Sequence, residues 1–336
     1  PLAGRITGET IMERGPIFIG GLDRCGKTLL RALLVSHPHI AIPAVGSNYW
    51  TFFYNQYGDL RDPANFERCL AAMLRYKHAR FIQPDPERIR HEFRQGQPSY
   101  ARLFALFHQH YAEREGKPRW GDQSGLIERY ADAIFAAYPG ARMIHMIRDP
   151  RDRYQASLAL WPKGKMRAGG ATARWLYSVR LAWRNHQRYP DRYLIVRYET
   201  LVEQPEATLR QVCAFIGEPY TPAMLTMEGA PSYRAKYGGG AAPDQSPITT
   251  AYIGRFRGAV PQREIAFMQA LAGRQMRAYG YEPEPIRLSL RDRLAFAAID
   301  GPVNLARMLT WRGLEALQQR FPATIRRQPP AAKVAA

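Results

Sequence analysis

The fold class of this 336-residue chain is indicated most clearly by one segment, Pro16-Ile17-Phe18-Ile19-Gly20-Gly21-Leu22-Asp23-Arg24-Cys25-Gly26-Lys27-Thr28. The apolar run 16–19 is typical of a short buried strand that ends in a glycine turn. The turn 21–28 fits G-x-x-x-x-G-K-T, and apolar residues at helical spacing follow it. Such a turn directs backbone N–H groups and the positive end of the helix dipole inward, where they bind an anion. We therefore predict a phosphate-binding loop, to which Arg24 and Lys27 add full charges.

Strands and helices continue to alternate along the chain. Residues 142–147 and 193–196 predict two further buried strands. Helices are predicted over 28–36, 126–138, 151–160, 173–188, 206–216 and 261–279. Strands that alternate with helices form parallel βαβ units. The chain is therefore predicted to have an α/β fold with a parallel central sheet of about five strands, flanked by helices.

The domain organisation follows from the same patterns. We expect residues 1–286 to form a single α/β domain with a helical insertion at about 47–118. Residues 287–328 predict a C-terminal helical extension made of two basic helices broken at Gly301-Pro302, and residues 329–336 predict a disordered tail. The glycine-rich stretch from Gly229 to Pro247 indicates a lid or connection within the main domain.

Charge and cysteine content narrow the class of protein. The chain has 48 basic and 29 acidic residues, and eleven of the basic ones lie within 140–189. This balance indicates an anionic partner: nucleic acid, anionic lipid or a phosphate-bearing small molecule. No apolar run reaches the roughly 20 residues that a transmembrane helix needs. Cys25, Cys69 and Cys213 are too scattered for a disulfide framework or a zinc site, which favours a reducing, cytoplasmic location.

A second anion site is predicted at Arg148-Asp149-Pro150-Arg151-Asp152, which ends the strand 142–147 and begins a helix that carries Ser157. An arginine at the carboxyl end of a strand, supported by a hydroxyl on the next helix, can hold a phosphate through a charged, bidentate contact. A nucleoside triphosphate carries no phosphate group that would occupy a separate second pocket, whereas a nucleotide with an additional 3′-phosphate does carry one.

With both sites in view, the chain resembles the sulfotransferases that use 3′-phosphoadenosine 5′-phosphosulfate, in particular their bacterial members. The resemblance covers about residues 15–285 and implies their P-loop NTPase-like fold. The blocks that carry it are 17–30, Ser36-His37-Pro38, 135–152, Arg197-Tyr198-Glu199, Ile253-Gly254-Arg255-Phe256-Arg257 and Gly280-Tyr281.

The resemblance implies transfer of a sulfuryl group from this donor to a hydroxyl of a small-molecule, glycan or lipid acceptor, without a metal. The product would be 3′,5′-adenosine diphosphate. Arg24 and Lys27 would be the catalytic cations. The residues implied in donor binding are Arg24, Cys25, Gly26, Lys27, Thr28 and Leu29 at the 5′ end, Arg148 and Ser157 at the 3′-phosphate, Tyr198 near the adenine, and Arg255 and Arg257 in the C-terminal block.

The chain departs from the family pattern at three places. Ser157 lies nine residues after Arg148, where relatives place the serine at the eighth. Gln123 stands where relatives often carry a lysine, and the segment 42–48 lacks the acid that relatives often have. Asp122 is our candidate for the general base, and its alternative role is to cap the helix that ends at Tyr138.

Two other functions stay open at this point. One is a P-loop kinase that uses ATP and magnesium, with Lys27 on the phosphates, Thr28 on the metal and Asp149 as the acid. The other is a non-catalytic nucleotide-binding homologue. No basic–aromatic strand motif for RNA stacking is present, so no nucleic-acid partner is expected.

The C-terminal residues and the histidines allow fewer conclusions. Residues 287–333 hold nine basic and three acidic residues with apolar residues interleaved, which predicts either peripheral contact with an anionic membrane or packing against the main domain.

The aromatic cluster 49–57 is interpreted as part of the hydrophobic core more readily than as an acceptor pocket. The histidines show no metal-ligand pairing with a third ligand, and His145 is predicted to be a satisfied core residue.

Overall fold

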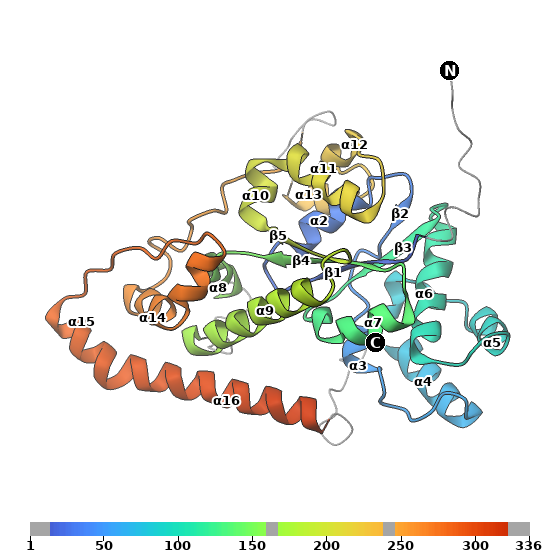
Figure 1. The fold of residues 1–336 in the computed structure, drawn as a ribbon, viewed down its shortest axis with the longest axis horizontal. Coiled ribbons are helices and arrows are strands. Elements are labelled where there is room, and N and C mark those ends of the chain that lie inside the picture. Colours follow the sequence, from blue (N-terminus) through green and yellow to red (C-terminus); the bar gives the residue numbers. More distant parts are fainter. Residues whose placement is uncertain (1–13, 159–166, 238–245, 322–336) are drawn as a thin grey trace, which may run out of the picture.

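A five-stranded parallel sheet forms the centre of the computed structural model, which describes residues 14–158, 167–237 and 246–321 (Figure 1). The strand order is β2-β3-β1-β4-β5. The strands are β1 (Ile17–Gly20), β2 (Ile40–Ala41), β3 (Arg119–Gln123), β4 (Arg142–Ile147) and β5 (Tyr193–Arg197). The predicted α/β fold with about five parallel strands is confirmed. The sequence pattern did not indicate β2 and β3, because β2 has two residues and β3 contains Gly, Asp and Gln.

Alternate side chains of the strands face opposite layers of helices, as a pleated strand requires. Ile17 and Ile19 pack with the layer that contains α2, whereas Phe18 packs with the opposite layer. Figure 1 shows the first layer above the sheet. Its helices are α2 (Lys27–Leu34), α10 (Tyr198–Glu203), α11 (Pro205–Ile216), α12 (Ala223–Thr226) and α13 (Pro231–Tyr237).

The opposite layer contains α7 (Ala131–Ala137), which follows a 3-10 turn (Ile127–Tyr130), and α9 (Ala168–Arg188). Helices α8 (Pro150–Leu158) and α14 (Gln262–Ala278) pack at one end of α9. His145 of β4 is fully buried and its two ring nitrogens contact the Tyr193 and Ser178 hydroxyls, so it is the core residue that we predicted.

The long connection between β2 and β3 is helical. It contains α3 (Tyr49–Phe52), α4 (Pro63–Arg75), a 3-10 turn (Ala79–Phe81), α5 (Pro86–Arg94) and α6 (Tyr100–Arg114). The aromatic side chains near its start pack into one buried cluster with α6, and Tyr49, Trp50 and Phe53 are almost fully buried. Their role in the core is therefore confirmed.

The strand order places a crevice at the carboxyl end of β1. Strand β1 pairs with β3 on one side and with β4 on the other, so the chain leaves this point in opposite directions. In open parallel sheets, ligands bind at such a switch point. The segments after β1, β3, β4 and β5 all reach this edge.

The last described elements form a C-terminal strap, defined here as α15 (Leu290–Ala295), a π-helical turn (Phe296–Asp300) and α16 (Gly301–Arg320). The predicted boundary at Gly301-Pro302 coincides with the start of α16, where the missing N–H of Pro302 disrupts no helical bond, but a π-helical turn joins this helix to α15 without an intervening loop. The strap packs on α9: the Gly169 amide donates to Asn304 Oδ1 (3.0 Å), and the rings of Trp311 and Tyr177 are 5.6 Å apart.

The strap therefore packs against the main domain, which is one of the two alternatives predicted for residues 287–333. Within the described part of the chain, no helix is both long enough and apolar enough to cross a bilayer. The glycines 238–240, the end of the helix predicted over 151–160 and the tail 329–336 lie outside the described residues.

Candidate active site

The loop between β1 and α2 has the strained backbone that an anion-binding turn needs. Gly21 and Gly26 have φ of 111° and 95°, a region that disfavours residues with a Cβ. A Cβ on Gly21 would lie 2.3 Å from the Met146 carbonyl oxygen, and one on Gly26 would lie 2.7 Å from the Tyr198 ring. Arg24 also has a positive φ, 66°. The loop is therefore pressed against β4 and α10, and glycine is required at both positions.

The side chains of the loop divide between its interior and the crevice. Lys27 Nζ donates to the carbonyl oxygens of Gly21 and Leu22, each at 2.7 Å, so its charge lies across the loop. The Cys25 thiol is buried and donates to the Leu22 carbonyl (2.7 Å). Cys25 was predicted to bind the donor, but its side chain points away from the crevice and only its backbone can contribute.

Arg148 reaches this loop from the end of β4. Its Nη1 donates to the Arg24 carbonyl (3.2 Å) and its Nη2 donates to the Tyr252 carbonyl (2.6 Å). Its guanidinium carbon lies 4.4 Å from the centre of the Tyr198 ring, a cation–π contact. The two predicted anion sites therefore meet in a single cleft.

This cleft, which we call the basic cleft, has a volume of about 620 Å³. Of the predicted site residues, Arg24, Gly26, Lys27, Thr28, Leu29, Arg148 and Tyr198 line it. Asn48, His78, Gln123, Ser124 and Tyr233 also line it. The Nε atoms of Arg24 and Arg148 are buried and have no hydrogen-bond partner among the described residues. Buried cationic donors without partners suit an anionic ligand.

Further arginines lie behind the loop. Arg174 pairs with Asp23 (3.3 Å), and Arg153 of α8 is fully buried with none of its three guanidinium nitrogens bonded in the described structure. Burial, together with the neighbouring Arg174, lowers the pKa of Arg153 to about 10. Burial alone would raise the pKa of Asp23, but Lys27, Arg174 and other cations lower it overall. The loop thus lies in a strongly positive environment.

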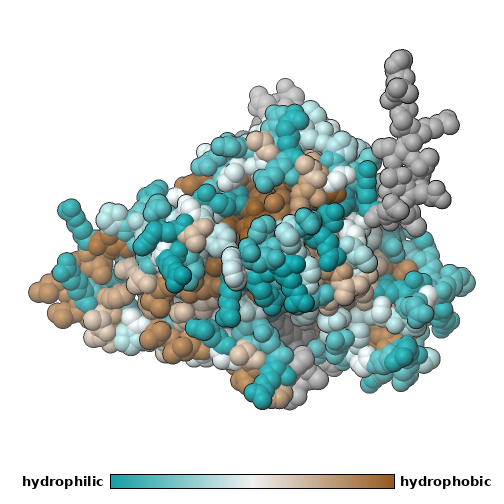
Figure 2. All heavy atoms as spheres, viewed as in Figure 1, coloured by the Kyte–Doolittle hydropathy of each residue, from teal (hydrophilic) through white to brown (hydrophobic). Residues whose placement is uncertain are grey.

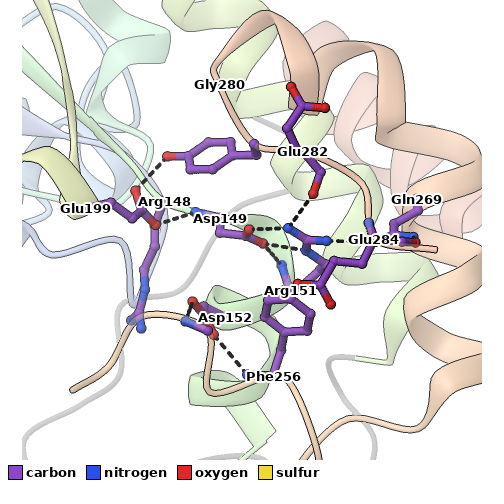
Figure 3. A network of polar contacts seen from close by, with 12 residues as sticks. Arg148, Asp149, Arg151, Asp152, Glu199, Phe256, Gln269, Gly280, Glu282 and Glu284 are labelled. Atoms are coloured by element: carbon purple, nitrogen blue, oxygen red, sulfur yellow. Dashed lines mark hydrogen bonds and ion pairs between the residues drawn. The ribbon is translucent and has the colours of Figure 1, made fainter. Parts of the chain in front are cut away.

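The residues after Arg148 hold the fold together and do not face the cleft (Figure 3). The Asp149 carboxylate accepts from Arg151 Nε (3.0 Å) and Nη2 (2.7 Å), and the Asp149 amide donates to Glu199 (2.9 Å). Figure 3 shows the Arg148 side chain extending away from this network. Because the Arg151 guanidinium pairs with both oxygens of Asp149 and neutralises its charge, Asp149 is a poor magnesium ligand, which disfavours the P-loop kinase hypothesis.

The C-terminal block contributes less than predicted. Asp152 accepts from the amides of Gly254 (2.6 Å) and Phe256 (2.9 Å), which fixes the loop with the Phe256 ring buried (Figure 3). Arg257 is turned outward and pairs with Glu284, so the structure does not support its predicted role in donor binding. Arg255 is exposed and lies 5.3 Å from the centre of the Tyr252 ring, at the margin of the cleft.

Ser157 is not in the cleft. Its hydroxyl is fully buried and donates to the Arg153 carbonyl one turn earlier in α8 (2.8 Å). Ala156 lines the cleft in its place. The prediction was wrong because one residue along a helix rotates the side chain by ~100°, and the serine of this chain stands one position too late.

Asp122 is not placed to act as a base. It is almost fully buried at the end of β3, where Oδ1 accepts from the Ser47 amide (2.9 Å) and Oδ2 accepts from the Ser47 hydroxyl (2.7 Å) and the Ser124 hydroxyl (2.9 Å). Burial alone would raise the pKa of Asp122, but His108 and Ser47 lower it overall. Neither the predicted base nor the alternative helix cap is correct, since Asp122 ties two loops of the cleft together.

His78 is a functional candidate that the sequence did not reveal. It lies between α4 and the following 3-10 turn and lines the cleft. Its Nδ1 contacts the Gly46 carbonyl (2.7 Å), which therefore receives the Nδ1 proton, and no bond to Nε2 is found in the described residues. Burial lowers the pKa of His78 below its ordinary 6.5. A neutral imidazole with a free Nε2 is able to accept a proton. Only the three-dimensional path of the insertion brings it here.

One further cluster resembles a metal site. His37, His39 and Glu218 place potential ligand atoms within 4.8 Å of one another. However, both ring nitrogens of His37 contact backbone groups, and Glu218 also pairs with Arg119 (3.1 Å) and Arg14 (3.2 Å). Two guanidinium groups that contact the same carboxylate favour an ion-pair network over a metal site.

Comparison with known proteins adds to this geometry. A sequence model described as "Sulfotransferase family" matches residues 16–222. The protein-tyrosine sulfotransferase of Drosophila melanogaster is 21% identical over 288 residues, which are 80% of this chain and 52% of that protein. The chain therefore spans about half the length of this curated relative.

Solved sulfotransferase domains are similar at low identity. The domain from the olefin synthase of Synechococcus PCC 7002 is 21% identical, with a TM-score of 0.49 over 76% of this chain and 94% of that one. The domain from the curacin biosynthetic pathway is 19% identical, with a TM-score of 0.47 over 80% of this chain and 99% of that one.

Proposed function

This chain belongs to the sulfotransferase family, and we propose that its basic cleft binds 3′-phosphoadenosine 5′-phosphosulfate and transfers the sulfuryl group to a hydroxyl-bearing acceptor. One observation carries the proposal: the phosphate-binding loop and Arg148 open into the same cleft, with Tyr198 beside both. The identity of the acceptor, whether small molecule, glycan or lipid, does not follow from the cleft.

The contacts of the cleft suit a nucleotide phosphorylated at both ends of its ribose. The loop 21–28 and the first turn of α2 would receive the 5′-phosphosulfate, because the N–H groups of a helix N-terminus bind oxyanions. Arg148 would bind the 3′-phosphate, since its Nε is unpaired and its guanidinium is held by two carbonyls. Tyr198 contacts both Gly26 and Arg148, and so connects the two ends.

The reaction would need only groups of this chain and its substrates. The acceptor oxygen attacks the sulfur atom, the bond between sulfur and the 5′-phosphate oxygen breaks, and 3′,5′-adenosine diphosphate leaves. Negative charge grows on the departing oxygen, and Lys27 and Arg24, which both line the cleft, would stabilise it. His78 Nε2 would take the proton from the acceptor hydroxyl.

His78 is favoured as the base over the other ionisable groups of the cleft. Asp23 lies on the donor loop, and neighbouring cations lower its pKa. His78 lies beside Asn48 on the helical connection between β2 and β3, a different segment from the donor loop, and burial lowers the pKa of its ring below 6.5, so the ring is neutral at pH 7. A base must face the acceptor rather than the donor, and geometry is the first requirement.

Ligand-dependent thermal stability tests the donor proposal. At 100 times its Kd, 3′,5′-adenosine diphosphate should stabilise the protein by ~2.7 kcal/mol without added metal. Arg148→Ala should weaken this binding at least tenfold, through loss of a charged phosphate contact. Arg257→Ala is the matched control, because Arg257 is exposed and paired with Glu284, and it should leave the affinity unchanged.

Two outcomes would contradict the proposal. Stabilisation only by ATP with magnesium would support the kinase reading. Tight binding of the diphosphate with no sulfuryl transfer to any acceptor in a broad panel of hydroxyl compounds would support a non-catalytic homologue.

We also propose that the outer face of the strap contacts an anionic membrane surface. Figure 2 shows apolar residues gathered along α15 and α16. Leu290 and Leu294 are 75% and 63% exposed, and Leu309 is 56% exposed. Arginines lie on the same elements at 291, 293, 307, 312 and 320. Apolar residues flanked by arginine are typical of helices that lie on anionic lipid.

Vesicle co-sedimentation tests this contact. The protein should sediment with vesicles that contain phosphatidylserine and not with pure phosphatidylcholine vesicles. Leu309→Glu should abolish sedimentation, whereas Leu271→Glu on α14, which is also partly exposed, should not. Equal effects of the two substitutions would contradict the proposal.

A further inference from the structure

Two adjoining cavities lie beneath the strap, away from the basic cleft. The first has a volume of about 910 Å³ and lies between α9, α14, β5 and α16. The second, of about 500 Å³, lies between α16, α9 and the segment after α3. Tyr177, Arg180, Glu315 and Gln319 line both cavities, so the two form one continuous groove. They share no lining residue with the basic cleft.

The two compartments differ in character. The larger is mainly apolar, with Leu176, Val179, Ile195, Met308 and Trp311 among its lining residues. The smaller is more polar, with Thr51, Asn55, Gln56, Arg184 and Gln318 among its lining residues. Both volumes lie in the range of small-molecule sites in proteins. An apolar compartment that continues into a polar one matches a molecule with a hydrocarbon chain and a polar head.

The charged side chains of the smaller compartment indicate which charge the polar head group of the bound molecule carries. Arg129 pairs with Glu315 at 2.7 Å, which neutralises the carboxylate of the groove. Among the described residues, Arg184 hydrogen-bonds only to the side-chain oxygen of Asn185, at 2.8 and 3.0 Å, and Arg180 has no ion-pair partner. Two guanidinium groups therefore line the polar compartment without a carboxylate partner.

We propose that this groove binds one single-chain anionic amphiphile, such as a fatty acid, with its chain in the apolar compartment and its acidic head on Arg180 and Arg184. The site goes beyond sulfuryl transfer and does not depend on the donor cleft.

Calorimetric titration of the full chain with dodecanoate, below its micellar concentration, tests the proposal. We expect one dodecanoate per protein, at least tenfold tighter binding than dodecyltrimethylammonium with the same chain, and loss of this preference in Arg180→Ala. Ala316→Trp should fill the groove from α16 and weaken dodecanoate binding at least tenfold. Ala306→Trp is the matched control, since it places the same ring on the exposed side of the same helix.

Several results would overturn the proposal: no binding of dodecanoate, equal binding of the two amphiphiles, full binding by Ala316→Trp, or an equal loss in Ala306→Trp. Dimer formation on adding dodecanoate would also overturn it, because a second copy would then cover the groove. Thermal stabilisation by 3′,5′-adenosine diphosphate, measured on each variant, shows that the variant is folded. It also separates failure of this site from failure of the donor cleft.

Discussion

The two walls of the basic cleft are built in different ways. One wall, which we propose to bind the nucleotide and call the nucleotide wall, is made of the loop 21–28, Arg148 and Tyr198, and these residues directly follow β1, β4 and β5. The other, which we propose to face the acceptor and call the acceptor wall, is made of Gly46, Asn48, His78 and residues 123–125 and is assembled from three distant segments. Asp122 joins two of these segments, and the Gly46 carbonyl holds the third through His78.

This difference separates the features of the site that short sequence motifs encode from the features that depend on tertiary structure. On the nucleotide wall, backbone geometry and strand ends bring the charges together, so their chemistry is inherent in short motifs. On the acceptor wall, a buried carboxylate and a carbonyl do the positioning, and no motif encodes them. Substitutions on the acceptor wall should therefore affect catalysis and stability, while the nucleotide affinity stays unchanged.

The largest expected effect is that of His78→Gln. Loss of a general base lowers kcat by about 10²–10⁴-fold, while the affinity for 3′,5′-adenosine diphosphate should not change. Because burial lowers the pKa of His78, the wild-type rate should be constant above pH 6.5 and fall as the pH drops through that lowered value. His91→Gln on the exposed side of α5 is the control. If His78→Gln retains the acid limb of the pH–rate profile, another group is the base.

Asp122→Asn should have the next largest effect, and mainly on stability. Asparagine offers one acceptor oxygen where Ser47 and Ser124 present three donors, and each buried donor left unpaired costs about 1–3 kcal/mol. Urea unfolding at pH 7 should show a loss of about 2–3 kcal/mol, against almost none for the exposed Asp191→Asn.

The pH dependence of stability supplies a second check on Asp122. The folded pKa of Asp122 is depressed, so its contribution is complete above the unfolded value near 3.8 and is lost as the pH falls through the folded value. The wild type and Asp122→Asn should therefore converge in stability below pH 3.8. A difference that stayed constant well below pH 3.8 would show that Asp122 is not stabilised as a carboxylate.

The same contrast explains how far the sequence could predict this protein. Strands β1, β4 and β5 are apolar runs and were predicted, whereas β3 reads Arg-Trp-Gly-Asp-Gln and has no strand pattern. Arg24, Lys27 and Arg148 were predicted because they lie beside strand ends, and all three line the cleft. Asp122 was found as a residue but given the wrong role, since its partner Ser47 is 75 positions away. His78 follows a surface helix, and only the packing of the insertion turns it toward the cleft.

Arg153→Met should produce a smaller effect of opposite sign. The Arg153 guanidinium is fully buried without a hydrogen-bond partner in the described residues, and such a group destabilises the folded state. A linear apolar side chain should raise the free energy of unfolding by about 1–2 kcal/mol at pH 7. Arg153→Lys, which keeps a buried charge, should not.

The lowered pKa of Arg153 predicts how the difference in stability between Arg153→Met and the wild type changes at alkaline pH. Its folded pKa is lowered to about 10, so the cost of burying the charge is present below that pH and diminishes as the pH rises through it. The advantage of Arg153→Met should therefore shrink above pH 10. A variant less stable than wild type at pH 7 would show that attraction to Asp23 outweighs the burial cost.

The smallest effects concern α8, where one position decides which side chain faces the nucleotide wall. Ser157→Ala should leave the affinity for 3′,5′-adenosine diphosphate unchanged, because the Ser157 hydroxyl bonds to the Arg153 carbonyl inside the helix. Ala156→Ser should instead place a hydroxyl in the cleft beside Arg148. One added hydrogen bond is worth about 1 kcal/mol, so the diphosphate should bind about fivefold tighter, and 5′-AMP, which lacks the 3′-phosphate, should not. Equal gains for both nucleotides would place the 3′-phosphate elsewhere than between Arg148 and α8.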